Sequence, residues 1–99
     1  MIIRIVRMHF TEAGAKEFLP IFDLNKEAIR NFPGCCHLQL LKDLTAPPPH
    51  TYTTLSHWQE AADLENYRKS ELFKSVWSRV KILFSDQPQA FSLVKFIEL

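Results

Sequence analysis

The segment IIRIVRMHF, residues 2–10, decides the fold that the sequence predicts. Its β-branched and other apolar side chains predict a strand. Apolar residues occupy both alternating sets of positions, with Val6 and Met8 in one set and Ile3 and Ile5 in the other. A sheet with one face in water alternates apolar with polar residues, so both faces of this strand are expected to be covered.

The remaining elements follow from apolar periodicity, helix caps and chain breaks at proline or glycine. Thr11 is expected to cap the first helix, which Pro20 should kink or split. The element order, β-α-β-β-α-α-β, is that of an α+β, ferredoxin-like split βαβ fold with a four-stranded antiparallel sheet. After the first strand we expect a helix at 12–31, strands at 35–43 and 51–58, helices at 61–68 and 71–84, and a strand at 90–98.

The last strand repeats the two-sided pattern, with Phe91 and Leu93 in one set of positions and Val94 and Phe96 in the other. The helices of one chain cover only one face in this topology, so the other face needs a second sheet, which a homodimer supplies. The chain has 99 residues, 46% of them hydrophobic, and a chain this small leaves much apolar surface uncovered. We therefore expect a single domain, 1–99, that forms a dimeric α/β barrel with a second copy.

Composition argues against several functional classes. The formal net charge is +1 with no Lys/Arg cluster, so nucleic acid is not an expected partner. No apolar run is long enough to span a membrane, and arginines interrupt the first apolar run before any cleavage site, so a cytoplasmic protein is expected. With only Gly14 and Gly34, the chain has no glycine-rich phosphate loop, and no nucleotide or flavin cofactor is expected.

The two central strands predict a specific register. If their connecting loop centres on Pro47, within the proline run 47–49, then His37 lies opposite His57 and Gln39 lies opposite Leu55. A shift of one residue would change both the pairing and the face of the sheet.

Arg7 and His9 are two residues apart on the first strand, so their side chains are expected on the same side of the sheet. With the two histidines of the hairpin, they would project into the space between two sheets, where buried polar groups need partners. Three interpretations stay open. The groups are solvated near strand ends, or they line a pocket for an anionic or phenolic molecule, or His37 and His57 hold a metal with a third ligand from Cys35 or the partner chain. No tight metal-binding spacing occurs, so we expect no metal.

The sequence offers no nucleophile constellation, because Ser56, Ser70 and Ser75 are explained as strand or helix-cap residues. Trp58 and Trp77 lie in periodic apolar patterns that indicate core packing. The same two indoles are suited to form a stacking wall for an aromatic ligand.

Several short motifs in order carry a family resemblance: Phe32-Pro33-Gly34-Cys35, Ser56-His57-Trp58, the run 64–67, and Ser70-Glu71-Leu72-Phe73 with Trp77. Their order and spacing resemble those of the antibiotic biosynthesis monooxygenase-like family of small dimeric α/β-barrel proteins. By this resemblance the chain forms a ferredoxin-like dimer. Some members oxidise phenolic polyketides with molecular oxygen and without metal or flavin, whereas others act on quinones, degrade haem or have no known reaction.

In such oxygenases the substrate is deprotonated to a carbanion, which reacts with oxygen directly. The protein supplies an apolar pocket, hydrogen-bond donors for the developing oxyanion, and exclusion of water. Trp58 matches an aromatic of that pocket, Thr54 stands where an amide is expected, and Leu64 stands where a tyrosine would help. In the haem-degrading branch the iron ligand is a histidine at the position of Trp77, whose indole cannot ligate iron, so haem degradation is not expected.

The sequence thus supports a homodimeric, cofactor-independent oxygenase acting with O2 on a small aromatic or quinone-type compound. Trp58 would shape the pocket, and Thr54, His37 or His57 would serve as polar contact or base, since an imidazole titrates near neutrality. The alternative is a non-catalytic small-molecule-binding or stress-associated dimer of the same fold. An enclosed void lined by a histidine and a hydroxyl would favour the enzyme, and a cavity filled by aromatic side chains would favour the alternative.

Overall fold

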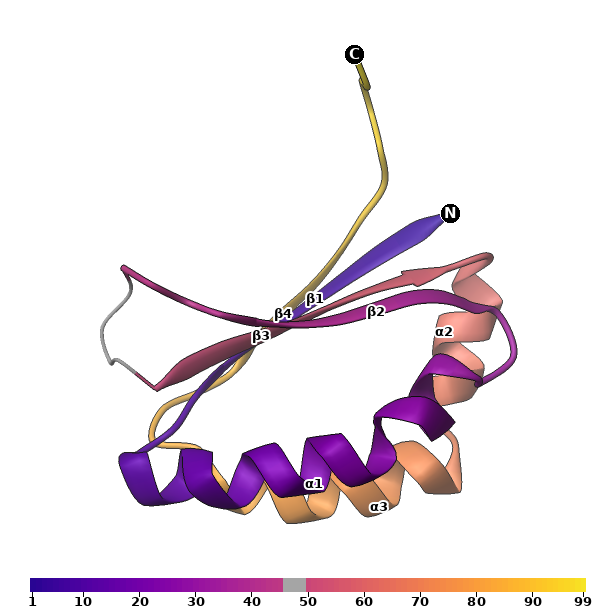
Figure 1. The fold of residues 1–99 in the computed structure, drawn as a ribbon. Coiled ribbons are helices and arrows are strands. Elements are labelled where there is room, and N and C mark those ends of the chain that lie inside the picture. Colours follow the sequence, from indigo (N-terminus) through magenta and orange to yellow (C-terminus); the bar gives the residue numbers. More distant parts are fainter. Residues whose placement is uncertain (46–49) are drawn as a thin grey trace.

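A computed structural model describes residues 1–45 and 50–99, and it places one antiparallel sheet above a layer of helices (Figure 1). The predicted α+β, ferredoxin-like fold with four strands is confirmed. The proline-rich loop expected at 46–49 lies outside the described residues. The elements are β1 (Ile2–His9), α1 (Glu12–Arg30), β2 (Cys35–Lys42), β3 (Thr51–Trp58), α2 (Ala61–Arg68), α3 (Glu71–Val80), the 3-10 helix η1 (Lys81–Leu83) and β4 (Gln89–Leu93).

The strands follow the order β2-β3-β1-β4, and the register of the central hairpin is the predicted one. His37 pairs with His57, and Gln39 pairs with Leu55. A β-bulge between Cys35 and His37 shifts the register at the start of β2, so that Cys35 pairs with Trp58. The bulge places Cys35 and His37 on opposite faces, although their spacing in the sequence would put them on the same one.

Helix α1 continues through Pro20, so the proline does not split it. Pro20 is exposed, so water can replace the backbone hydrogen bond that the proline removes. At the start of the helix the Thr11 hydroxyl accepts from the Gly14 backbone N–H at 3.0 Å, which confirms the predicted cap.

Alternation along β1 defines two faces of the sheet. Arg4, Val6 and Met8 lie on the face that α1 and α3 pack beneath, which we call the covered face (Figure 1). Ile3, Ile5, Arg7 and His9 lie on the other side, which we call the open face. Helix α2 lies at one end of the sheet, below the ends of β2 and β3.

Strand β4 is shorter than predicted and ends at Leu93 instead of 98. Leu93 pairs with Ile3, the second residue of β1, so few positions of β1 remain for pairing beyond it. Residues 94–99 leave the sheet and project away from the body of the molecule (Figure 1). Their apolar side chains are exposed, with Phe96 at 93% and Ile97 at 76%.

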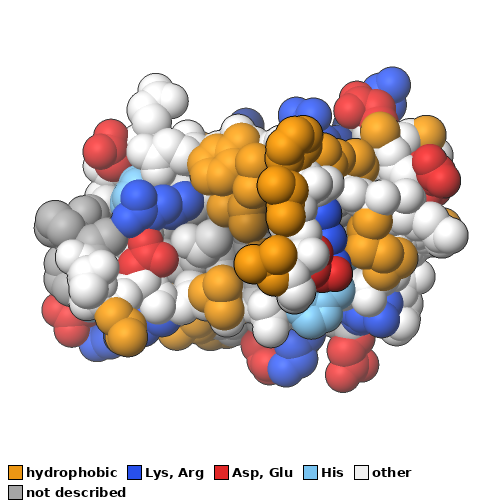
Figure 2. Space-filling view, turned by 90° about the horizontal axis from the view of Figure 1, so that it is seen from above, with side chains coloured by type: hydrophobic (Ala, Val, Ile, Leu, Met, Phe, Trp, Pro, Cys, Tyr) orange, Lys and Arg blue, Asp and Glu red, His pale blue; other side chains and the backbone are white. Residues whose placement is uncertain are grey.

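Hydrophobic side chains gather in the middle of the open face, seen from above in Figure 2. Leu41, Phe91 and Leu93 there are 42%, 45% and 47% exposed. The register places them around Ile5 and Leu55 at the centre of the sheet. The structure therefore leaves an apolar face uncovered, as the two-sided strand pattern predicts for one copy of the chain.

Two apolar clusters lie between the covered face and the helices. In the larger, the rings of Phe10 and Phe18 stack with centroids 4.6 Å apart. The smaller is built around Trp58, close to α2. The larger cluster contains Met8, Phe10, Ala15, Phe18 and Val80, and the smaller contains Cys35, Trp58 and Leu64.

The turn before β2 fixes α2 against the end of the sheet. Gly34 has φ of 87°, a conformation that favours glycine. A Cβ atom at this position would lie 2.3 Å from the side chain of Asp63, which accepts a hydrogen bond from the Glu60 backbone N–H at the start of α2. Gly34 is therefore needed twice, for its backbone angle and for the close approach of α2.

Candidate active-site chamber

The structure divides the predicted site residues between the two faces of the sheet. Thr54 pairs with Val6 on the covered face, and Trp58 shares that face because it lies four residues further along β3. Arg7, His9, His37 and His57 lie on the open face, as their pairing with Thr53, Thr51 and each other shows. One protomer does not bring Trp58 together with any of the three histidines.

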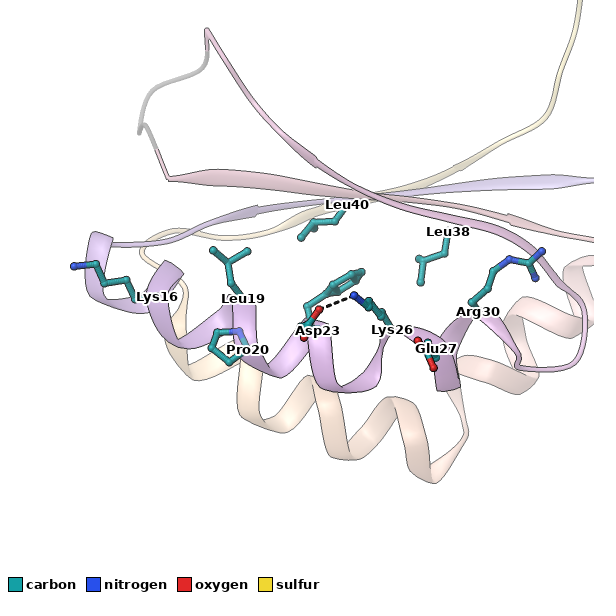
Figure 3. A pocket seen from close by; sticks show the side chains of 10 residues that line it. Lys16, Leu19, Pro20, Asp23, Lys26, Glu27, Arg30, Leu38 and Leu40 are labelled. Carbon is teal, nitrogen blue, oxygen red and sulfur yellow. Dashed lines mark hydrogen bonds and ion pairs between the residues drawn. The ribbon is translucent and has the colours of Figure 1, made fainter.

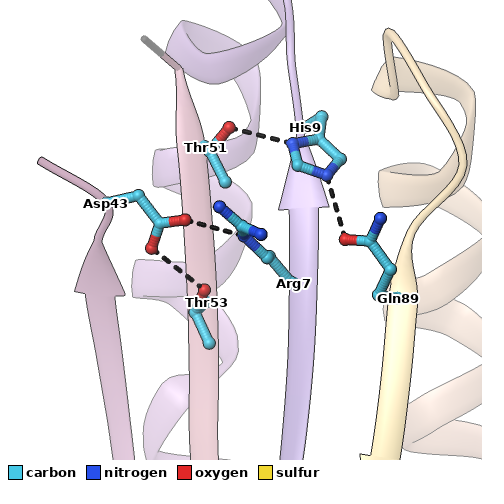
Figure 4. A network of polar contacts seen from close by, with 6 residues as sticks. All are labelled: Arg7, His9, Asp43, Thr51, Thr53 and Gln89. Atoms are coloured by element: carbon cyan, nitrogen blue, oxygen red, sulfur yellow. Dashed lines mark hydrogen bonds and ion pairs between the residues drawn. The ribbon is translucent and has the colours of Figure 1, made fainter. Parts of the chain in front are cut away.

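Arg7 and His9 belong to a hydrogen-bonded network at one end of the open face (Figure 4). Arg7 Nε donates to Asp43 Oδ2 at 2.8 Å, and the Thr53 hydroxyl donates to the same carboxylate at 3.4 Å. His9 lies 2.9 Å from the Thr51 hydroxyl through Nδ1 and 3.1 Å from Gln89 Oε1 through Nε2. His9 is buried rather than solvated, and its two ring nitrogens tie β1 to β3 and β4.

His37 and His57 form a cross-strand pair at the other end of the open face, with ring centroids 4.9 Å apart. The pKa of His57 is lowered by burial, by the neighbouring His37 and by Lys95. The third metal ligand considered for this pair, Cys35, lies on the covered face because of the β-bulge. Within residues 1–45 and 50–99, no three His, Cys, Asp or Glu side chains gather in a way that could hold a metal ion.

A cavity of about 300 Å³ lies beneath the covered face, between the two apolar clusters. Its residues come from all four strands and all three α-helices, so it is a chamber within the fold rather than a surface dent. Most of the lining is apolar. The side chains that bear on chemistry are Arg4, Thr54, Ser56, Trp58, Tyr67, Arg68, Phe73 and Trp77.

Aromatic side chains form one wall of this chamber. Trp58 is only 1% exposed, and its indole N–H donates to the Ser56 hydroxyl at 3.0 Å. Its ring stacks on Tyr67, with centroids 5.0 Å apart. Phe73 then contacts Tyr67 edge-on at 5.3 Å and stacks on Trp77 at 5.7 Å. Each indole thus packs against other aromatic rings and lines the cavity, while the stacking wall for an aromatic ligand stays a prediction.

Two hydroxyl groups of the lining, those of Thr54 and Tyr67, make no side-chain hydrogen bond within the described residues. No fully buried side-chain nitrogen or oxygen of these residues lacks a partner, so both hydroxyls are accessible to solvent or to a ligand. Burial, followed by the neighbouring Cys35, raises the pKa of Tyr67 to about 12. Tyr67 therefore remains a neutral phenol at physiological pH and can donate a hydrogen bond to a developing negative charge. Burial also raises the pKa of the Cys35 thiol, which disfavours a thiolate nucleophile.

A second, larger hollow of about 990 Å³ lies between α1 and the edge strand β2 (Figure 3). Leu38 and Leu40 point into it from the strand, and charged side chains of α1 stand along its outer side. Two of these, Lys26 and Asp23, form an ion pair at 2.6 Å. The hollow is an open groove that gives no exclusion of water, so the smaller chamber is the better candidate for oxygen chemistry.

The sequence profile of the antibiotic biosynthesis monooxygenase family matches residues 1–77. The chain belongs to this family. Membership supports a general monooxygenase-like role, and the family resemblance of the short motifs is confirmed. A search of curated proteins finds no match to the sequence.

Solved structures agree with the family assignment at the level of the fold. A crystal structure of an antibiotic biosynthesis monooxygenase superposes with a TM-score of 0.88 at 16% identity, over 98% of this chain and 100% of that one. A conserved protein of Methanosarcina mazei Go1 gives 0.87 at 18% identity, over 97% and 94%. A Mycobacterium tuberculosis protein gives 0.85 at 14% identity, over 98% and 96%. No helix in the described part of the chain is long and apolar enough to cross a membrane.

Four lining residues of the chamber were not predicted from the sequence: Arg4, Ser56, Tyr67 and Arg68. A signal for Arg4 was present, because it is the single charged residue among the otherwise apolar even-numbered positions of β1. Arg68 carries no comparable signal, since the last turn of a helix commonly holds a basic residue. Only the packing of α2 against the end of the sheet brings it to the chamber.

Proposed function

We propose that the protein is a cofactor-independent oxygenase for a small aromatic or quinone-type compound and that the chamber is its active site. The observation that carries this proposal is an aromatic wall, Trp58 to Trp77, beside two hydroxyl groups without a hydrogen bond in a partly enclosed space. A flat ring would pack against the wall, and Thr54 and Tyr67 would contact its oxygen atoms. Family membership supports the same reaction class.

The reaction balances without an external reductant. A ring CH2 flanked by aromatic carbonyl or phenol groups loses a proton, and the resulting carbanion gives its electrons to O2. The product gains a C=O in place of the CH2, and the second oxygen atom leaves as water. In the described residues the chamber is lined by no histidine or carboxylate, so the proton passes to water as the substrate ionises. The contribution of the protein is then to stabilise the anion, with Tyr67 as donor.

The test measures oxygen uptake by the full chain with anthrone-type and naphthohydroquinone compounds, in air and under anaerobic conditions. Turnover should require oxygen. Thr54→Val, which keeps the shape but removes the hydroxyl, should lower the rate by roughly tenfold to a hundredfold. The matched control is Thr53→Val on the open face. Equal turnover without oxygen, or equal loss in the two variants, would contradict the proposal.

We further propose that the protein is a homodimer in which a second copy covers the open face. The exposed side chains of Phe91 and Leu93 support this assembly, together with the apolar residues that follow 93. His37 and His57 would then lie in the interface between copies. Light scattering on the eluted protein tests the proposal directly, and a stable single copy at micromolar concentration would contradict it.

A non-catalytic binding protein is the second candidate. The feature in its favour is the lining of the chamber, in which the described residues supply no general base. If this alternative holds, aromatic compounds bind in the chamber, but no oxygen is consumed with any of them.

A further inference from the structure

Two arginines form a charged end of the mostly apolar chamber. Arg4 comes from β1 and Arg68 from the last turn of α2, and both line the cavity. Arg4 lies across from Ser56 on one neighbouring strand and from Ser92 on the other. Its guanidinium donates to the Ser92 hydroxyl at 3.1 Å. A long cationic side chain thus sits on the covered face, where every other even-numbered position of β1 is apolar.

Negative charge near the two guanidinium groups is scarce. Arg68 lies 3.6 Å from Glu65, but the same carboxylate also lies 3.9 Å from Lys69. Arg4 takes part in no ion pair within the described residues, and its side-chain partner is a neutral hydroxyl. Burial and then the neighbouring Arg68 lower the pKa of Arg4, while Glu65 has the opposite effect. Arginine stays protonated despite such a shift, so uncompensated positive charge remains at this end of the chamber.

We propose that the chamber selects a flat aromatic acid, with its ring against the Trp58 wall and its carboxylate held by Arg4 and Arg68. The inference rests on the chamber being the ligand site proposed above. A planar carboxylate matches the fork of a guanidinium group and carries its charge at all pH values near neutrality. A simple phenol is neutral there and would leave the excess positive charge of this end uncompensated. The volume of about 300 Å³ is at the lower end for ligand pockets, which favours a small ring system.

Calorimetric titration of the full chain with 1-naphthoate and with 1-naphthamide tests the inference, because the two probes share a ring and differ in charge. The wild type should bind the acid more tightly by about tenfold or more. Arg4→Met and Arg68→Met should each remove most of this preference, and Arg4→Lys should retain part of it. Arg79→Met is the matched control, because Arg79 is exposed on α3 and has the same charge.

The outcomes distinguish a failure of the acid preference from a failure of the chamber as the ligand site. Equal affinity for both probes in the wild type, with both weakened by Trp58→Phe, overturns the acid preference and leaves the chamber as the ligand site. Binding of neither probe overturns the chamber and the inference together. An equal loss of preference in Arg79→Met and Arg68→Met also overturns it, since long-range charge would then explain the result. If Arg4→Met does not fold, the exposed Arg68 carries the test.

Discussion

On the open face, Arg7 and His9 are hydrogen-bonded to neighbouring strands, whereas below the covered face Thr54 and Tyr67 line the chamber without such bonds. Arg7 and His9 already have hydrogen-bond partners, and these bonds strengthen one end of the sheet. The hydroxyl groups of Thr54 and Tyr67 are the ones that a ligand can satisfy. The candidate site is therefore recognised by polar groups of the chamber that lack a hydrogen bond, rather than by the general reactivity of a side chain.

The largest effect of a substitution is expected at the centre of the open face. Ile5→Asp places a charge among apolar side chains that we expect a second copy to bury, and this should cost roughly 3–5 kcal/mol of association free energy. The dimer should dissociate, as light scattering across a dilution series would show. Leu24→Asp is the control, because Leu24 is 81% exposed on α1, away from that face. Identical masses for the wild type and both variants would mean that no partner covers the open face.

Substitutions on the covered face should change the free energy of unfolding rather than the association of two copies. Trp58→Ala removes a fully buried indole and should lower the free energy of unfolding by roughly 3–5 kcal/mol, measured by chemical denaturation. Trp58→Phe retains most of the packing but loses the hydrogen bond to Ser56, with an expected cost of about 1–2 kcal/mol. Trp77→Ala is the matched control, since this half-buried side chain should cost less than Trp58. An equal cost for Trp58→Ala and Trp77→Ala would contradict the assignment of Trp58 as the central core residue.

Much of the fold could be predicted because local signals and tertiary packing agree. β3 and α2 match their predicted bounds, and the hairpin register follows from one loop centre. The end of β4 could not be predicted, because the apolar pattern continues past Leu93 while the neighbouring strand does not. Pairing with another strand, rather than the pattern along one segment, decides where a strand ends.

The site was harder to predict than the fold. Thr54 and Trp58 do line the chamber, but the histidines expected beside them lie on the opposite face. Alternation along one strand separates His57 from Trp58, as neighbours in a strand always point apart. The residues that complete the lining come from six further elements, and no spacing in the sequence records that Arg4 and Arg68 line the same cavity.

The ionisation of Tyr67 tests whether its hydroxyl lies in a low-dielectric chamber. Its pKa of about 12 means that the folded protein resists forming the phenolate, so stability should fall as the pH rises from 10 towards 12. Absorbance at alkaline pH should show a tyrosine that ionises near pH 12 in the wild type. This step should be missing in Tyr67→Phe, and Tyr52→Phe is the matched control. If the late step persists in Tyr67→Phe, the Tyr67 hydroxyl is not in a low-dielectric chamber.

The smallest effect is expected at the histidine pair on the open face. Burial, His37 and Lys95 all lower the pKa of His57, so the neutral imidazole is the favoured form. A lowered histidine pKa gives full stability above the ordinary value of 6.5, and stability is lost as the pH falls from there through the lowered value. Because we expect a second copy to cover this face, acidification in that window should weaken the dimer modestly.

Sedimentation at several pH values would measure this weakening. His57→Gln should flatten the pH dependence, because it removes the titrating ring while keeping a polar side chain of similar reach. His50→Gln, at the opposite end of β3, should leave the dependence unchanged. A pH profile that is the same in the wild type and in His57→Gln would separate the histidine pair from the interface. Apolar contacts alone would then hold two copies together at the open face, and its polar groups would stabilise only the sheet of their own chain.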